Sequence, residues 1–158
     1  MDKAALLHAI IAQLQRDLAT QTQAALTSRD EATHEESKPE NKYDMHAQEA
    51  AYLAEGQARL AAELNEAIAL YHGLSPAPWP HGKAAGLGAL IAVENKGQTN
   101  FFYIGPRNGG MEVSLGHHVV TVITPSSPLG KKFLGATVGQ AVPMPGRAAA
   151  PHHIVAIT

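Results

Sequence analysis

Glycine and proline are distributed very unevenly along this chain of 158 residues. The first 72 residues contain one glycine, Gly56, and one proline, Pro39, whereas the remainder contains thirteen glycines and nine prolines. Because both residue types interrupt helices, the first part can form long helices, while the second must form short elements joined by turns. The sequence therefore predicts two domains, with residues 1–75 helical and residues 76–158 of mixed structure.

Two apolar stripes at helical spacing run through the first domain. One predicts a helix over residues 3–30 and consists of Leu7, Ile10, Ile11, Leu14, Leu18 and Ala25. The other predicts a helix over residues 38–72 and consists of Tyr43, Ala47, Ala50, Leu53, Ala54, Leu60, Leu64, Ile68 and Tyr71. Since a lone amphipathic helix is marginal in water, we expect the two stripes to face each other in an antiparallel helical hairpin, a coiled coil.

The second domain contains runs of β-branched and aromatic residues that are bounded by Gly, Pro, Asn and Ser. These runs predict strands over residues 87–95, 99–105, 117–125 and 152–158. Between them, Leu129, Phe133 and Leu134 recur at helical spacing and predict one short helix. The expected fold class is α+β, in which a small antiparallel sheet with a helix packed on it follows the hairpin.

Charge and cysteine content limit the possible functions. Residues 1–75 carry twelve acids against six bases, net −6, and residues 76–158 carry two acids against six bases, net +4. An acidic half does not suit autonomous DNA or RNA binding through a basic patch. The chain has no cysteine, so disulfides and thiolate zinc sites are excluded, and we expect a cytoplasmic monomer without a membrane segment.

The segment "THEESKPENKY", residues 33–43, joins the two predicted helices and concentrates carboxylates. Thr33 with Glu36, and Ser37 with Glu40, both match the capping-box pattern, and Pro39 is tolerated in a first helical turn. Carboxylates at a helix N-terminus are also favoured by the helix dipole. Helix capping is therefore one interpretation of these acids, and a binding function is the other.

Two stretches resemble the Gre family of bacterial transcription elongation factors, GreA and GreB. The segment "THEESKPENKY" is similar to the family's hairpin tip, where an Asp and a Glu precede an Asn. The stretch "VVTVITPSSPLGKKFLGATVGQAV", residues 119–142, is similar to a strand followed by Ser-Pro-x-Gly, Leu-Leu-Gly and Val-Gly-Asp. With the order of elements, the likeness extends over nearly the whole chain. It implies a helical hairpin followed by an FKBP-like domain.

The resemblance also implies a function. In this family the hairpin enters the secondary channel of RNA polymerase, and its tip carboxylates help to hold a second Mg²⁺ there, so that backtracked RNA is cleaved. Mg²⁺ prefers hard oxygen ligands, and a two-metal site stabilises both the attacking and the leaving oxygen. The factor then needs no bound cofactor of its own and no reaction of its own. Its partner is RNA polymerase, with the RNA 3′ end contacted indirectly.

Carried over residue by residue, the resemblance assigns the catalytic and metal-binding role to Glu36 and Glu40. The tip-flanking residues are Glu35, Lys38, Asn41 and Lys42, and the polymerase-docking residues are Ser127, Pro128, Leu129 and Gly130. The sequence departs from the family because Pro39 widens the spacing of the two acids to four residues, Glu36 stands where Asp is usual, and Gln140 replaces an acid. A shift of one residue matters for metal-site geometry.

Three further interpretations remain open. The altered spacing favours a secondary-channel regulator that does not stimulate cleavage. An FKBP-like half suggests a peptidyl-prolyl isomerase, whose site would need accessible aromatic residues from the set Trp79, Phe101, Phe102, Tyr103 and Phe133. The pairs His117–His118 and His152–His153 lie on predicted strands, where neighbours point to opposite faces, so we expect a structural role for them.

Overall fold

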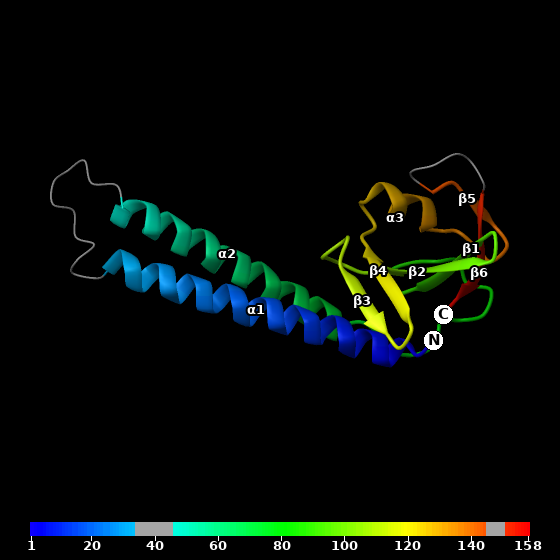
Figure 1. The fold of residues 1–158 in the computed structure, drawn as a ribbon. Helices are drawn as coiled ribbons and strands as arrows, with labels where there is room; N and C mark the ends of the chain where they lie inside the picture. Colours follow the sequence, from blue (N-terminus) through cyan, green and yellow to red (C-terminus); the bar gives the residue numbers. More distant parts are fainter. Residues whose placement is uncertain (34–45, 145–150) are drawn as a thin grey trace. The chain divides into compact units, whose positions relative to one another are not determined.

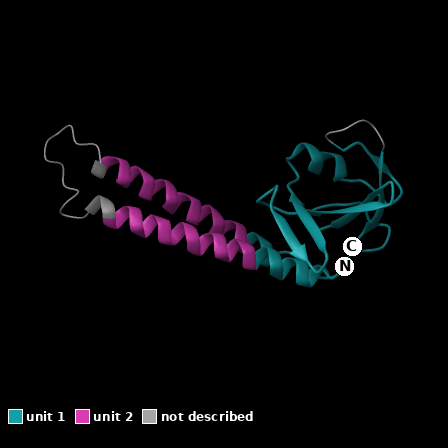
Figure 2. Cartoon of the chain, in the orientation of Figure 1, with its two compact units in different colours: residues 1–11, 70–158 teal, residues 12–69 magenta. Residues whose placement is uncertain are grey.

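The computed structural model describes residues 1–33, 46–144 and 151–158. Contacts divide the chain into two compact units, shown in different colours in Figure 2. We call residues 12–69 the hairpin unit, and residues 1–11 together with 70–158 the sheet unit. The predicted division into domains after residue 75 stays a prediction.

The hairpin unit is built from two long helices, α1 (Lys3–Thr33) and α2 (His46–His72), which run antiparallel (Figure 1). Helix α1 starts where the side chain of Asp2 caps it, because its Oδ1 accepts a 2.9 Å hydrogen bond from the backbone N–H of Ala4. The predicted helix over residues 3–30 is confirmed. The predicted start of the second helix at residue 38 lies outside the described residues.

The faces by which the two helices meet differ from the predicted stripe on α2. Leu53 and Leu60 are 52% and 43% exposed, so their predicted place in the interface is wrong. Other members of the predicted stripe are half-buried or buried as expected, namely Ala50, Ala54, Leu64, Ile68 and Tyr71. Gln57 and Ala61, which the stripe did not include, are half-buried as well. The nine-residue stripe combined two neighbouring rows of the helix, and the row with small side chains is the one that faces α1.

The sheet unit contains six strands in the order β3-β4-β2-β1-β6-β5 and one short helix. The predicted strands correspond to β1 (Leu90–Asn95), β2 (Gln98–Ile104), β4 (His118–Ile123) and β6 (His152–Ile157). The predicted short helix is α3 (Pro128–Phe133). The α+β fold class, with a helical hairpin followed by a sheet with one helix, is confirmed.

One strand pairing corrects the expected antiparallel sheet. Strands β2 and β4 are parallel, with Phe101 opposite Val120, so the sheet is mixed. The reason is β3 (Glu112–Leu115), which forms the edge of the sheet and returns as an antiparallel hairpin into β4. These four residues carry no strand signal of their own, and turns that contain glycine flank them on both sides. The two-residue strand β5 (Ala141–Val142) was missed for the same reason, its shortness.

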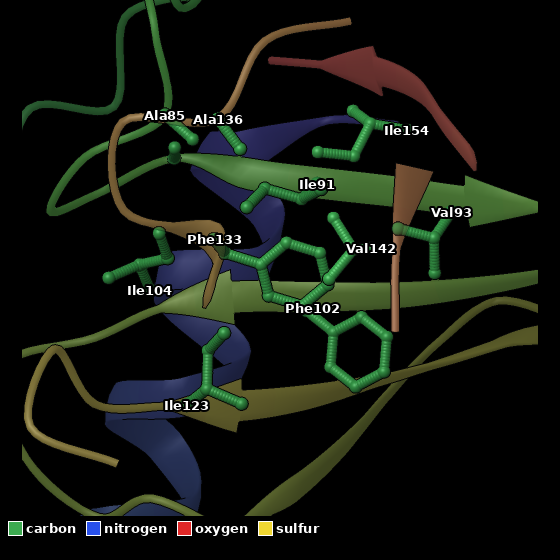
Figure 3. Packing of buried hydrophobic residues seen from close by; sticks show 11 residues of the cluster. Ala85, Ile91, Val93, Phe102, Ile104, Ile123, Phe133, Ala136, Val142 and Ile154 are labelled. Atoms are coloured by element: carbon green, nitrogen blue, oxygen red, sulfur yellow. The ribbon is translucent and has the colours of Figure 1, made fainter. Parts of the chain in front are cut away.

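The main core lies between α3 and one face of the sheet (Figure 3). Alternate residues of the strands point into it, as the pleat requires, and Phe133 of α3 packs on Phe102 with ring centroids 5.4 Å apart. The cluster comprises Ala85, Ala89, Ile91, Val93, Phe102, Ile104, Ile123, Phe133, Ala136, Val142 and Ile154. This core fixes α3 and the turn that precedes it on the sheet.

A tryptophan in the segment between α2 and β1 lies between two lysines of the sheet unit. The ammonium groups of Lys83 and Lys3 lie 4.7 and 5.5 Å from the ring centroid of Trp79, within the range of cation–π attraction. The Trp79 indole N–H also donates to the carbonyl of Lys83 at 3.3 Å. Burial lowers the pKa of Lys3 from its ordinary value. These contacts hold the connecting segment against the start of α1.

Candidate functional site

The six acids, lysines and asparagine predicted at the hairpin tip all fall within residues 34–45. These are Glu35, Glu36, Lys38, Glu40, Asn41 and Lys42, and they lie outside the described residues. What the structure describes is the pair of helices whose ends this segment joins, α1 ending at Thr33 and α2 beginning at His46. The assignment of Glu36 and Glu40 as metal ligands therefore stays a prediction.

The predicted docking residues form the turn that starts α3. Ser127 is the N-cap, and its Oγ accepts a 2.9 Å hydrogen bond from the backbone N–H of Gly130. The same hydroxyl donates to the carbonyl of Thr124 at 2.8 Å. Pro128 occupies the first helical turn, where its missing N–H removes no hydrogen bond. Ser127 and Pro128 thus set the direction in which the chain leaves β4.

Gly130 is needed because the turn brings it against the backbone. A Cβ at this position would collide with the carbonyl oxygen of Thr124 and would lie 2.8 Å from its carbonyl carbon. That carbonyl is itself held, since it accepts hydrogen bonds from both the N–H and the hydroxyl of Ser127. Leu129 is half-buried against the core. The Ser-Pro-Leu-Gly motif therefore has a structural explanation, and its docking role stays a prediction.

Cationic and apolar side chains are exposed in the last turn of α3 and in the segment that follows it in the chain. Leu134 and Val138 are 40% and 58% exposed, and Lys131 is exposed in the last turn of α3. Lys132 donates a 2.8 Å hydrogen bond to the carbonyl of Pro143. Neither Leu134 nor Val138 was predicted as a docking residue from the sequence. We call Lys131, Leu134 and Val138 the α3 surface; it suits an apolar partner surface that carries acids.

Two buried phenols occupy the other face of the sheet; the sequence predicted a packing role for Tyr71 and offered Tyr103 as a core residue or as part of an isomerase site. The Tyr71 hydroxyl donates to the carbonyl of Arg107 at 2.8 Å, while the Tyr103 hydroxyl is buried with no hydrogen-bond partner among the described residues. A Cβ at Gly105 would collide with the Tyr71 hydroxyl and would lie 2.9 Å from Cγ1 of Val122. Tyr71 can occupy this position because Gly105 has no side chain.

Burial governs the ionisation of both phenols. It raises the pKa of Tyr71 above its ordinary value, and the neighbouring Tyr103 raises it further. Burial also raises the pKa of Tyr103. Both groups are held in the neutral form, so they serve as structural hydroxyls and do not provide a base at neutral pH.

The other residues singled out in the sequence are the aromatic residues of a possible isomerase site and the two histidine pairs. Phe102, Tyr103 and Phe133 are buried in the sheet unit, so these aromatic rings do not line an accessible isomerase site. The ring of His118 lies 4.9 Å from that of Phe101, and His152 is within hydrogen-bond distance of the Asn95 amide. Among the described residues, no three His, Asp or Glu side chains lie together as metal ligands would. Within the same residues, no helix is long and apolar enough to span a bilayer.

Comparisons with known proteins identify only distant structural neighbours. No protein-family model and no curated protein matches the sequence. The chain is similar to the solved structure of GreA factor homolog 1 (Gfh1) of Thermus thermophilus, with 18% identity, a TM-score of 0.39 and coverage of 94% of both chains. It is also similar to Gfh1 of Thermus aquaticus, with 17% identity, a TM-score of 0.38 and coverage of 92% of both chains.

A third similar structure is that of the transcription factor Gfh1, with 20% identity and a TM-score of 0.35. It is matched over 94% of this chain and 93% of its own.

Proposed function

We propose that this protein is an accessory factor of RNA polymerase of the Gre type, which inserts its helical hairpin into the secondary channel and stimulates cleavage of backtracked RNA. The observation that carries the proposal is the coincidence of two features in one chain. Residues 34–45, with their carboxylates, join the ends of two antiparallel helices. The Ser-Pro-Leu-Gly turn begins a short helix on a β-sheet, as the resemblance implies.

In this proposal, the chain contributes ligands and position, and the polymerase contributes the reaction. Glu36 and Glu40 would supply hard carboxylate oxygens for a Mg²⁺ that belongs to the polymerase active site. A second Mg²⁺ stabilises the charge that develops on the oxygens during phosphodiester cleavage. The hairpin delivers these oxygens, and the sheet unit docks at the channel entrance, with the α3 surface as its contact.

A cleavage assay on stalled elongation complexes tests this function. Intact protein is added to complexes with backtracked, 3′-labelled RNA, and the release of short 3′ fragments is measured against Glu36→Gln, Glu40→Gln and the double variant. Glu63→Gln is the matched control, because Glu63 is an exposed carboxylate on α2 well removed from residues 34–45. We expect release with the intact protein and with Glu63→Gln, and a strong reduction with the double variant.

A second candidate function is regulation of the polymerase through the same channel without cleavage. It is favoured by the four-residue spacing of Glu36 and Glu40, with Pro39 between them. Competition separates the two functions. A regulator would displace an authentic cleavage factor from the elongation complex while releasing no RNA fragments itself. If the intact protein neither releases fragments nor competes, both proposals are wrong.

A further inference from the structure

The half of the hairpin unit next to residues 34–45 has an unusual interior. We call residues 19–33 of α1 and 46–60 of α2 the distal half, and residues 12–18 and 61–69 the proximal half. Over residues 19–30 and 48–60, every buried or half-buried residue is Gln, Ala, Ser or Gly. The large apolar side chains there, Leu26, Tyr52, Leu53 and Leu60, are between 43% and 67% exposed. The distal half therefore has little buried apolar surface to hold it together.

The proximal half is different. Leu14 and Ala67 are 0% and 1% exposed, and Leu18, Leu64 and Ile68 are half-buried. Burial of an aliphatic side chain of this size contributes roughly 1.5–3 kcal/mol, whereas alanine has only one methyl group to bury. The two halves thus differ in the amount of buried apolar surface, which is the main contribution to the stability of a helix pair.

Heptad spacing shows where the change occurs. On α1 the positions seven residues apart are Leu7, Leu14, Gln21 and Ser28, and on α2 they are Tyr71, Leu64, Gln57 and Ala50. Both series change from large apolar residues to polar or small ones at the glutamine. A polar residue at such a position specifies register in paired helices at a cost in stability.

The two glutamines are costly because their side-chain oxygens are buried. Oε1 of Gln21 and Oε1 of Gln57 have no hydrogen-bond partner among the described residues. An unsatisfied buried acceptor loses its hydration without compensation, and separation of the helices would restore that hydration. Each glutamine therefore favours the separated state over the paired one.

Two open grooves lie between α1 and α2 in this part of the hairpin unit, and Gln57 lines one of them. One groove, of about 710 Å³, is lined by Gln57 of α2 and by Thr20, Gln23 and Ala24 of α1. The other, of about 400 Å³, is lined by Thr22 and Ala25 of α1 and by Ala54, Ala58 and Ala61 of α2. Gln21 stands between Thr20 and Thr22 in the sequence and lines neither groove. The lining of both grooves consists mostly of small or polar residues.

We propose that the distal half opens locally, with α1 and α2 separating beyond the level of Gln21 and Gln57 while the proximal half stays paired. Local opening of this kind has a lower free energy than global unfolding wherever buried apolar surface is scarce. The opening is a property of the helix pair itself and does not rest on the proposed function. It makes the spacing of the two helix ends that flank residues 34–45 adjustable.

Hydrogen exchange of backbone amides, followed by mass spectrometry on the full chain, tests the proposal. We expect amides of residues 19–30 and 48–60 to have protection factors at least about tenfold lower than amides of residues 7–18 and 61–71. Equal protection in the two halves would overturn the proposal. This measurement uses the unmodified protein and so does not depend on any variant folding correctly.

A pair of matched double variants tests the cause. In Gln21→Leu with Gln57→Leu, apolar side chains replace the buried amides, and protection of the distal amides should rise by about tenfold or more. In Gln15→Leu with Gln48→Leu, the same substitution is made at exposed positions of the same two helices that line neither groove, so helix propensity changes equally. In this control variant, protection of the distal amides should rise less than threefold. If both double variants raise protection alike, buried amides are not the cause and the proposal fails.

Discussion

The hydroxyl of Tyr71 donates a 2.8 Å hydrogen bond to the backbone carbonyl of Arg107, thirty-six residues further along the chain. Tyr71 is 1% exposed, so the bond joins the end of α2 to the loop after β2 inside the sheet unit. In Tyr71→Phe this bond is lost, and we expect the free energy of unfolding to fall by about 1 kcal/mol. Urea denaturation measures it, with Tyr52→Phe, at a 67% exposed position, as the control.

The substitution Tyr103→Phe should change the free energy of unfolding in the opposite direction. The Tyr103 side chain is 0% exposed, and its hydroxyl has no partner among the described residues. Removing an unsatisfied buried hydroxyl ends its desolvation cost while the ring continues to fill the same space. We expect the free energy of unfolding to rise by about 1 kcal/mol in the same urea experiment. A loss comparable to that of Tyr71→Phe would show that the hydroxyl has a partner after all.

Stability should fall at alkaline pH because of these two phenols. Their pKa values are raised in the folded chain, mainly by burial, so the folded state holds these protons more tightly than the unfolded state does. The stabilisation is fully present below the ordinary tyrosine pKa of about 10 and is lost as the pH rises above it. Thermal melting between pH 8 and pH 11 should show the decline, with a smaller decline in the double variant Tyr71→Phe with Tyr103→Phe. An equal decline would assign the effect to other groups.

Much of the fold could be predicted because its signals are local. Leu7 and Leu14 at helical spacing predicted α1, and the run of aromatic and β-branched residues around Phe102 predicted β2. The four residues of β3 carry no such signal, since they pair only because β4 returns beside them, and this is a non-local event. Leu53 was misassigned because hydrophobicity alone does not distinguish two neighbouring rows of one helix when alanines let the helices approach closely.

The candidate site was predictable in part. Its acids were found from composition and resemblance, although they lie outside the described residues, and the N-cap at Ser127 could have been recognised from a serine that precedes a proline at a helix start. The requirement for glycine at residue 130 could not be predicted from the sequence. It depends on the position of the Thr124 carbonyl, which only the folded turn defines. The heptad positions of Gln21 and Gln57 were visible in the sequence, but their buried oxygens were not.

Substitutions in the turn that starts α3 test whether the Ser-Pro-Leu-Gly motif has a structural role or a docking role. Ser127→Ala removes both the cap on Gly130 and the hydrogen bond to Thr124, and we expect a loss of about 1 kcal/mol in the free energy of unfolding. Ser127→Thr keeps a hydroxyl that can donate and accept, so it should stay close to the unmodified protein. Gly130→Ala forces a Cβ against a held carbonyl and should cost about 1–3 kcal/mol.

Polymerase binding by the same variants separates the two roles. If the motif acts only by holding α3 in place, Ser127→Thr binds like the unmodified protein. In that case Val138→Asp, which changes an exposed side chain of the α3 surface, weakens binding without lowering stability. If instead Ser127→Thr is stable but does not bind, the serine itself contacts the polymerase. Gly130→Ala with unchanged stability would contradict the close approach to Thr124 on which the structural role depends.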